Sequence, residues 1–135
     1  MAIHAPQVTI SEGCWSTDAD GWLSSAVRFP YLAALRTQVE QGIAKLFYFH
    51  SDGELCGAIV LRIDQCGDVS EGVICAAAAE LAGIDMTATI IPAVEKMFHG
   101  CEVVRFHTSV PAVAKKMARL GYQAEEIVSR KKING

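Results

Sequence analysis

The stretch "EGVICAAAAELAGIDMTATIIPAVEKMFH", residues 71–99, decides the fold, because an apolar run gives way to a helical pattern across one short turn. Residues 71–78 are small or apolar apart from Glu71, which predicts a strand buried on both faces. From Asp85 to His99 the apolar residues recur at helical spacing. Pro92 predicts either a kink or a helix whose regular part begins near Thr89. A buried strand followed directly by a helix indicates an α/β domain.

The flanking segments extend this pattern in both directions. Upstream, the sequence predicts a strand over 7–10, a polar turn over 16–21 and helical structure over 22–41 that Pro30 divides. Asp52-Gly53 between two apolar runs predicts an antiparallel hairpin over 45–64. Downstream, we expect a strand over 102–108, a helix that Ser109 begins and Gly121 ends, and a last strand over 122–133. On this helix three apolar residues should face inward (Val113, Met117 and Leu120) and three basic residues should face water (Lys115, Lys116 and Arg119).

These elements form one continuous domain over residues 1–135, since no repeat or low-complexity linker interrupts them. Residues 1–44 supply the first strand and helices, 45–64 the hairpin, and 70–133 a loop, a helix and a C-terminal strand–helix–strand unit. A chain of this length buries a real core without disulfides or metal. The fold class is therefore α/β, with a mixed, mainly antiparallel sheet of about six strands flanked by helices.

Composition excludes several classes of protein. Apolar residues make up 51% of the chain and charged residues 20%, which is ordinary for a soluble globule. The start "MAIHAPQVTI" has neither a basic segment nor an apolar leader, and no apolar run approaches the ~20 residues of a membrane span. The 5 cysteines are odd in number and contain no C-x-x-C pair, so we expect buried free thiols. The chain is predicted not to be secreted and not to contact a membrane.

Charge is distributed unevenly, although the net charge is only −3. From Arg105 onward there are 7 Lys or Arg residues and 2 Asp or Glu residues, so the C-terminal part is basic. A basic segment meets anionic ligands or partners, but it serves equally as a solvated helix face. Because no aromatic residues alternate with the basic ones, nucleic acid is not an expected partner.

Motifs for metal binding or hydrolysis are missing. Residues 16–21 imitate the start of a calcium loop, but the twelfth position is Val27 where a bidentate Glu is needed. The sequence contains no G-x-S-x-G elbow and no H-E-x-x-H helix. We therefore expect no metal site.

Two segments, "ELAGIDMTATIIPAVEK" at 80–96 and "CEVVRFHTSVPAVAKKMARLGY" at 101–122, resemble the GNAT superfamily of acyl-CoA-dependent N-acyltransferases. "RLGY" before the last predicted strand is similar to the family motif Y-x-K-L-G-F. The resemblance covers about residues 45–133, with a weaker match upstream. It extends to the short GNAT-like proteins that phage genomes encode. It implies a GNAT-like sheet and a cofactor site for acetyl-CoA after the fourth strand.

In the family, the loop after that strand carries Q/R-x-x-G-x-G/A, and its backbone N–H groups hold the CoA pyrophosphate. The resemblance assigns this role to five residues of the chain: Leu81, Ala82, Gly83, Ile84 and Asp85. Gly83 matches the last position of the motif. Ala78 stands at the Gln/Arg position and Leu81 at the first glycine, so two of the three signature residues differ.

Charge and capping also bear on this loop. Glu80 and Asp85 add negative charge where a pyrophosphate would bind. Asp85 is in addition a good N-cap, so its side chain competes for the N–H groups that a phosphate would need.

The family's general acid, a tyrosine on the last helix, is matched by Met117, which has no proton to give. The asparagine that commonly opens that helix is matched by Val110. A general base remains available as Glu71, on the buried strand, or as His107, at the end of the next strand. Both are expected beside the cleft that the fold makes between those strands.

Two hypotheses follow, and we favour the first. In the first, the chain is a GNAT-like module with a degraded acetyl-CoA loop that binds no cofactor. It acts through protein contacts, in a homo-oligomer or as a virion-associated component of a phage. In the second, it is an active N-acetyltransferase of unknown amine acceptor that uses acetyl-CoA. Either role implies an intracellular, cytoplasmic or virion-associated protein.

Overall fold

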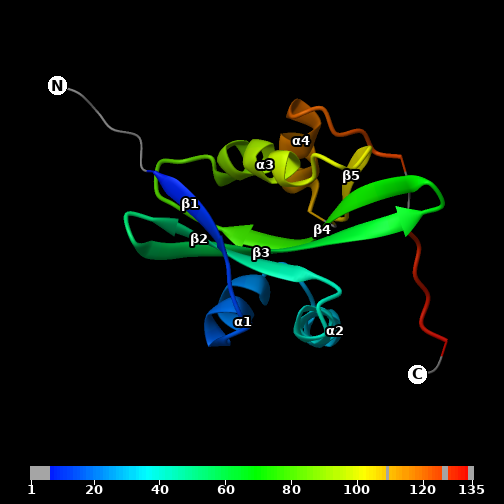
Figure 1. The fold of residues 1–135 in the computed structure, drawn as a ribbon, viewed down its shortest axis with the longest axis horizontal. Helices are drawn as coiled ribbons and strands as arrows, with labels where there is room; N and C mark the ends of the chain where they lie inside the picture. The colour runs from blue at the N-terminus through cyan, green and yellow to red at the C-terminus, as the bar shows by residue number, and fades with distance from the viewer. Residues whose placement is uncertain (1–6, 109, 126–127, 134–135) are drawn as a thin grey trace.

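A computed structural model describes residues 7–108, 110–125 and 128–133. It shows a five-stranded sheet with helices on both faces (Figure 1). The strands lie in the order β1-β2-β3-β4-β5, which is also their order along the chain. The elements are β1 (Val8–Glu12), α1 (Thr17–Leu23), α2 (Phe29–Glu40), β2 (Lys45–Ser51), β3 (Glu54–Cys66), β4 (Val69–Ala79), α3 (Met86–Met97), β5 (Val103–Phe106) and α4 (Pro111–Arg119).

The sheet is mixed and mainly antiparallel, as the sequence predicted. β1 to β4 pair antiparallel with their neighbours, and β4 pairs parallel with β5. The predicted hairpin is confirmed as β2 and β3. Asp52 and Gly53 at its tip have φ angles of 52° and 81°, the conformation that an Asp-Gly turn supplies.

The two sides of β4 are paired to different extents. β3 follows β4 from Val69 to Ala79, whereas β5 pairs only with Glu71 to Ile74. The register with β3 shifts where Val60 faces Ala76 and Leu61 faces Ile74, so Cys75 is an extra residue in β4. This bulge bends the strand at the point where β5 ends.

Each face of the sheet has its own core. α3 and α4 cover one face and α1 and α2 the other, as Figure 1 shows. Phe49, Ile59 and Val94 are fully buried on the α3 side, and Leu23, Leu46 and Val60 on the α1 side. The helix over 86–97 runs through Pro92, and its N-cap is Asp85, as predicted.

Three sequence-based expectations need correction. Residues 16–21 do not form a polar turn, because Ser16 stands at an N-cap and Asp18 and Asp20 favour the first turn of α1. The sheet has five strands rather than about six, because residues 122–125 and 128–133 form no strand. Arg130 of this segment instead stacks on the ring of Tyr31 in α2, 4.8 Å from its centroid. Val113, expected to face inward, is exposed. Ser109 lies outside the described residues.

Composition-based expectations have mixed outcomes. All five cysteines are free, but only Cys56 is buried; Cys14 and Cys66 are exposed. No helix in the described ranges is long and apolar enough to cross a bilayer.

A network of ion pairs fastens β3, β4 and β5 together on the α2 side of the sheet. Asp64 accepts hydrogen bonds from Arg62 at 2.7 and 3.1 Å and from Arg105 at 2.5 Å. Arg105 also donates to Glu71 at 2.9 Å. Arg62 completes the network with a bond to Gln38 of α2 at 3.1 Å. Arg62, with help from Arg105, holds the pKa of Asp64 below its usual value. The network thereby fixes Arg105 where β5 leaves β4.

Replacing Gly72 tests how tightly α3 packs on β4. An added Cβ at Gly72 would lie 2.5 Å from the buried ring of Phe98, so Gly72→Ala should lower the free energy of unfolding by about 1–3 kcal/mol in urea titration. Gly100→Ala is the matched control, since a Cβ there meets no atom within 4 Å. Equal stability of the two variants would contradict the packing.

Asp64→Asn tests the ion-pair network. Because the pKa of Asp64 is lower in the folded state, its ionised form stabilises the fold above the unfolded pKa, and this contribution is lost as pH falls through the folded pKa. The variant should therefore be less stable by about 1–2 kcal/mol at pH 7. The difference should shrink below about pH 4, where the wild-type carboxylate also becomes protonated. Asp68→Asn, in an exposed turn, should show no such trend.

Candidate functional site

The open edge of β4 is the centre of the candidate site. Beyond Ile74, β4 has β3 on one side and, within the described residues, no strand on the other. Backbone N–H and C=O groups on that side are available to a ligand that runs alongside the strand. Cys75 marks one end of this edge, and the loop that follows Ala79 marks the other.

The loop over residues 80–85 is held by its own bonds. The N–H of Glu80 donates to the carbonyl of Cys56, and the N–H of Ile84 donates to the carbonyl of Leu81. Gly83 has a φ of 77°, a left-handed conformation that glycine adopts readily. The side chains of Leu81 and Ile84 pack against the core. The N–H groups of Leu81, Ala82 and Gly83 make no bond to the described backbone, while that of Ile84 is already engaged.

A small cleft lies where α3 begins beside α4. It has a volume of about 80 Å³, and six residues line it: Asp85, Thr87, Ala88, Lys116, Arg119 and Leu120. Asp85 accepts a hydrogen bond from the N–H of Ala88 at 3.3 Å, which confirms its capping role. Lys116 lies 3.9 Å from the Asp85 carboxylate. Two cations therefore face one carboxylate at the N-terminus of α3, an arrangement that favours an anion.

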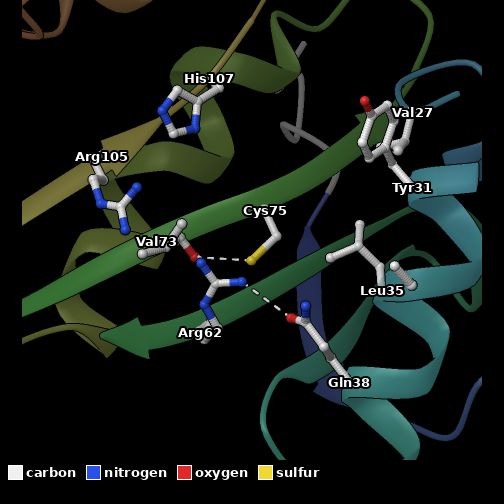
Figure 2. Close-up of a pocket in the computed structure, with 10 residues that line it drawn as sticks. Val27, Tyr31, Leu35, Gln38, Arg62, Val73, Cys75, Arg105 and His107 are labelled. Atoms are coloured by element: carbon white, nitrogen blue, oxygen red, sulfur yellow. Dashed lines mark hydrogen bonds between the residues drawn. The ribbon is translucent and has the colours of Figure 1, made fainter. Parts of the chain in front are cut away.

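A larger cavity lies on the opposite face of the sheet, between β4, β5 and α2. Its volume is about 230 Å³. Ten residues line it: Val27, Tyr31, Ala34, Leu35, Gln38, Arg62, Val73, Cys75, Arg105 and His107. Figure 2 shows Arg62 bonded to Gln38 across the space between β3 and α2, with Cys75 beside it and with Tyr31 further away, next to Val27. Burial raises the pKa of the Cys75 thiol, which keeps it protonated at neutral pH.

The two candidate bases predicted from the sequence, Glu71 and His107, have different surroundings in the structure. His107 lines the cavity, whereas Glu71 does not. The Glu71 carboxylate is bound to Arg105 at 2.9 Å, and its side chain is only 26% exposed. His107 is therefore placed to meet a ligand, and Glu71 is placed to hold Arg105.

Neither Met117 nor Tyr122 offers a proton to the cavity. Met117, at the position of the family's tyrosine, is buried between α4 and the sheet at 3% exposure. The Tyr122 hydroxyl donates to Glu95 at 3.1 Å, and its ring meets Phe106 edge-on. Burial, reinforced by Glu95, raises the pKa of Tyr122 well above its usual value. Tyr122 thus fastens β5 to α3.

Sequence reasoning missed most of the cavity, because its residues come from four separate segments. Tyr31 and Gln38 were assigned only to a helix, and Arg62 only to a hairpin strand. Arg62 was the signal that could have been used: an arginine within the otherwise apolar run of residues 55–63 needs a partner, which predicts nearby polar groups. Among the described residues, no group of three or more His, Cys, Asp or Glu side chains is placed to hold a metal ion.

By sequence, the chain matches no protein-family model and no curated protein. By structure it resembles 51 solved chains. One is a Bacillus subtilis acetyltransferase in complex with CoA, with a TM-score of 0.71 and 16% identity, over 89% of this chain and 79% of that one.

Two others extend the comparison. The aminoglycoside N-acetyltransferase AAC(6')-Iy in complex with CoA has a TM-score of 0.66 and 14% identity, over 99% of this chain and 100% of that one. A transcriptional regulator from Bacillus halodurans C-125 has a TM-score of 0.69 and 14% identity, over 94% of this chain and 100% of that one. The arrangement of strands and helices is thus shared with acetyltransferases along almost the whole chain, and the protein has a GNAT-like fold.

Proposed function

We propose that the protein is an acyl-CoA-dependent N-acyltransferase that acts on a small amine. One observation carries the proposal: the open edge of β4 leads from the cationic cleft at the start of α3 to the cavity beside His107. CoA-bound solved chains of the same fold are consistent with this function. From the sequence alone we favoured the role through protein contacts; here we favour the acyltransferase.

The reversal rests on Lys116 and Arg119. From the sequence, both residues were expected to face water, with contact to an anionic ligand as the alternative, and Glu80 and Asp85 counted against a phosphate. In the structure both cations line the cleft, and Glu80 does not. Asp85 faces Lys116 at 3.9 Å, so its charge is offset within the cleft. The N–H groups of Met86 and Thr87, in the first turn of α3, have no partner among the described residues. A pyrophosphate would therefore meet two cations and free helix N–H groups.

The CoA arm would follow the open edge of β4. Its pantetheine part carries amide groups, which pair with a strand edge as a neighbouring strand would. The unpaired stretch from Cys75 to Ala79 is the part of β4 that offers such an edge. This path brings the thioester toward Cys75 and the cavity on the α2 side.

The reaction needs an activated acyl group, which acetyl-CoA supplies when bound. His107 takes the proton that the amine loses as its nitrogen attacks the thioester carbon. A C–N bond forms, the C–S bond breaks, and the departing thiolate is protonated from water, since Met117 has no proton to give. The chain's own groups thus orient the amine and remove its proton.

A second candidate function is a GNAT-like module that acts through protein contacts, in a homo-oligomer or as a virion-associated component. Two observations favour it: Asp85 already caps α3, and a buried methionine occupies the general-acid position. Under this function the cleft at α3 would bind no nucleotide. Association with phage stays a prediction that the resemblance alone supports.

Acetyl-CoA binding tests the proposed function, and isothermal titration measures it. We expect a Kd in the micromolar range, weakened about tenfold by Lys116→Ala and by Arg119→Ala through loss of a charge-assisted contact. Asp85→Asn should tighten binding, because asparagine keeps the helix cap but removes the negative charge. Lys115→Ala is the matched control, since Lys115 is exposed on the same helix but does not line the cleft.

No measurable binding of acetyl-CoA by the folded wild-type chain would overturn the proposal and leave the protein-contact role. If Lys115→Ala weakened acetyl-CoA binding as much as Lys116→Ala, the loss of affinity would come from the overall charge of α4 and not from the cleft.

His107→Gln tests the role of the cavity in acyl transfer. The variant should lower kcat by about 100-fold or more while acetyl-CoA affinity stays unchanged, with CoA thiol release as the assay. Glu71→Gln is the comparison variant, because Glu71 contacts Arg105 and not the cavity. If Glu71→Gln lost activity and His107→Gln kept it, the base would be Glu71 instead.

A further inference from the structure

The cavity on the α2 side also limits which amine the protein accepts, and this inference rests on the proposed function. Its polar lining consists of the guanidinium groups of Arg62 and Arg105, the amide of Gln38, the imidazole of His107, the hydroxyl of Tyr31 and the thiol of Cys75. Among the residues that the structure describes, no Asp or Glu lines it. The cavity therefore presents hydrogen-bond donors to whatever enters, while the charges of Arg62 and Arg105 are balanced by Asp64 and Glu71 behind the lining.

Arg105 has donor capacity to spare. Its Nε donates to Glu71 and its Nη2 to Asp64, while its Nη1 makes no bond to the described residues. Asp64 and Glu71 hold the guanidinium from outside the cavity lining and so fix its plane. A fixed guanidinium with a free Nη1 is suited to a carboxylate, because little side-chain freedom is lost on binding.

Arg62 differs from Arg105 in this respect. All three of its nitrogens are engaged: Nε and Nη2 with Asp64, and Nη1 with Gln38. Arg62 supports the network and contributes positive charge, whereas Arg105 is free to make a direct contact.

His107 lies on the same face of the same chain segment as Arg105, two residues further on. Side chains at that spacing on an extended strand are separated by roughly 7 Å. A molecule with its anionic group at Arg105 would thus hold a nearby amine next to His107. The remaining wall is formed by the apolar side chains of Val27, Leu35 and Val73.

A further cation lies at the rim. Arg130 of the C-terminal segment stacks on the ring of Tyr31, which itself lines the cavity, and donates to its hydroxyl. Arg130 therefore adds positive charge next to Tyr31, a residue of the cavity lining.

We propose that the acceptor is a small amino acid: a primary amine whose carboxylate binds Arg105 and whose apolar side chain packs against Leu35 and Val73. The cavity volume of about 230 Å³ suits a molecule of this size and excludes a folded polypeptide other than its chain end.

L-valine and L-leucine are the probes, each paired with its carboxamide, which keeps the amine and side chain but lacks the carboxylate. Binding is read without turnover, as protection of Cys75 from iodoacetamide at about pH 9, because burial raises the pKa of this thiol and the thiolate is the form that reacts. Alkylation is followed by mass spectrometry of the Cys75 peptide. The amino acids should slow alkylation of Cys75, and the carboxamides should need at least about tenfold higher concentration for equal protection. Exposed Cys14 and Cys66 serve as internal controls whose labelling should not change.

The double variant Arg105→Gln/Glu71→Gln removes the guanidinium together with the carboxylate of Glu71, while Asp64, the other partner of Arg105, keeps its bonds to Arg62. It should erase the preference for the amino acid over the carboxamide. Arg36→Gln/Glu40→Gln removes an exposed ion pair on α2 outside the cavity with the same zero change in net charge, and it should keep the preference. Circular dichroism confirms that the double variant is folded; if it is not, Arg105→Lys should reduce the preference in its place.

The outcomes separate this inference from the proposed function. If acetyl-CoA binds but the amino acids and carboxamides protect Cys75 equally, or not at all, the acceptor class is overturned and the acyltransferase proposal stands. If the amino acids protect Cys75 through Arg105 but acetyl-CoA does not bind, the cavity assignment stands and the transferase function fails. Protection by acidic or amidated peptides in preference to the amino acids would also overturn the acceptor class.

Discussion

The unequal pairing of β4 is the constraint on which the rest of the structure depends. One side of β4 is satisfied by β3 along its whole length, but β5 pairs with only its first part, Glu71 to Ile74. A strand edge inside a folded domain leaves backbone groups that need partners. The bulge at Cys75 bends β4 just where β5 ends, and no described strand fills the gap in the sheet beside Cys75 to Ala79. A ligand bound along this edge would supply hydrogen-bond partners for the backbone groups of β4 that β5 does not reach.

Charge compensation keeps the two ends of this gap in place. At one end, Asp64 and Glu71 hold Arg105 against the sheet and leave part of its guanidinium free. At the other, Lys116 offsets Asp85, so the N-cap of α3 does not repel an anion as strongly as the sequence implied. In both places the carboxylates support cations that face a cavity. The sequence shows the same residues as separate charges, and only their spatial pairing reveals this arrangement.

Local signals were sufficient for most of the fold. Asp52-Gly53 identified the hairpin because its positive φ angles belong to a turn that few other residues form. Asp85 identified the start of α3 because an N-cap is a contact within one turn of helix. The alternation of apolar and polar residues over 122–133 was misleading. It shows that the segment is compatible with a β-strand, but it does not show that a neighbouring strand is available for pairing. Ser16 to Gly21 were misassigned because helix-capping residues are also turn residues.

The candidate site was predicted only in part. Resemblance located the loop at Gly83, and His107 was named as a base and does line the cavity. The cations of the cleft were missed because Lys116 and Arg119 come from α4, some 30 residues beyond the loop, and nothing local to either segment indicates that they meet. Arg105 was likewise visible only as the start of a basic region, since its orientation is fixed by Asp64 and Glu71 from two other strands.

Amide hydrogen exchange along β4 tests the central claim most directly. If acyl-CoA lies on the open edge, acetyl-CoA should slow exchange of amides within 75–79 and in the 80–85 loop, and should leave β1 and β2 unchanged. Desulfo-CoA, which has the nucleotide and the pantetheine amides but no thioester, should protect the same amides. Protection confined to the surface of α4, or no change at β4 while the chain remains folded, would contradict the account.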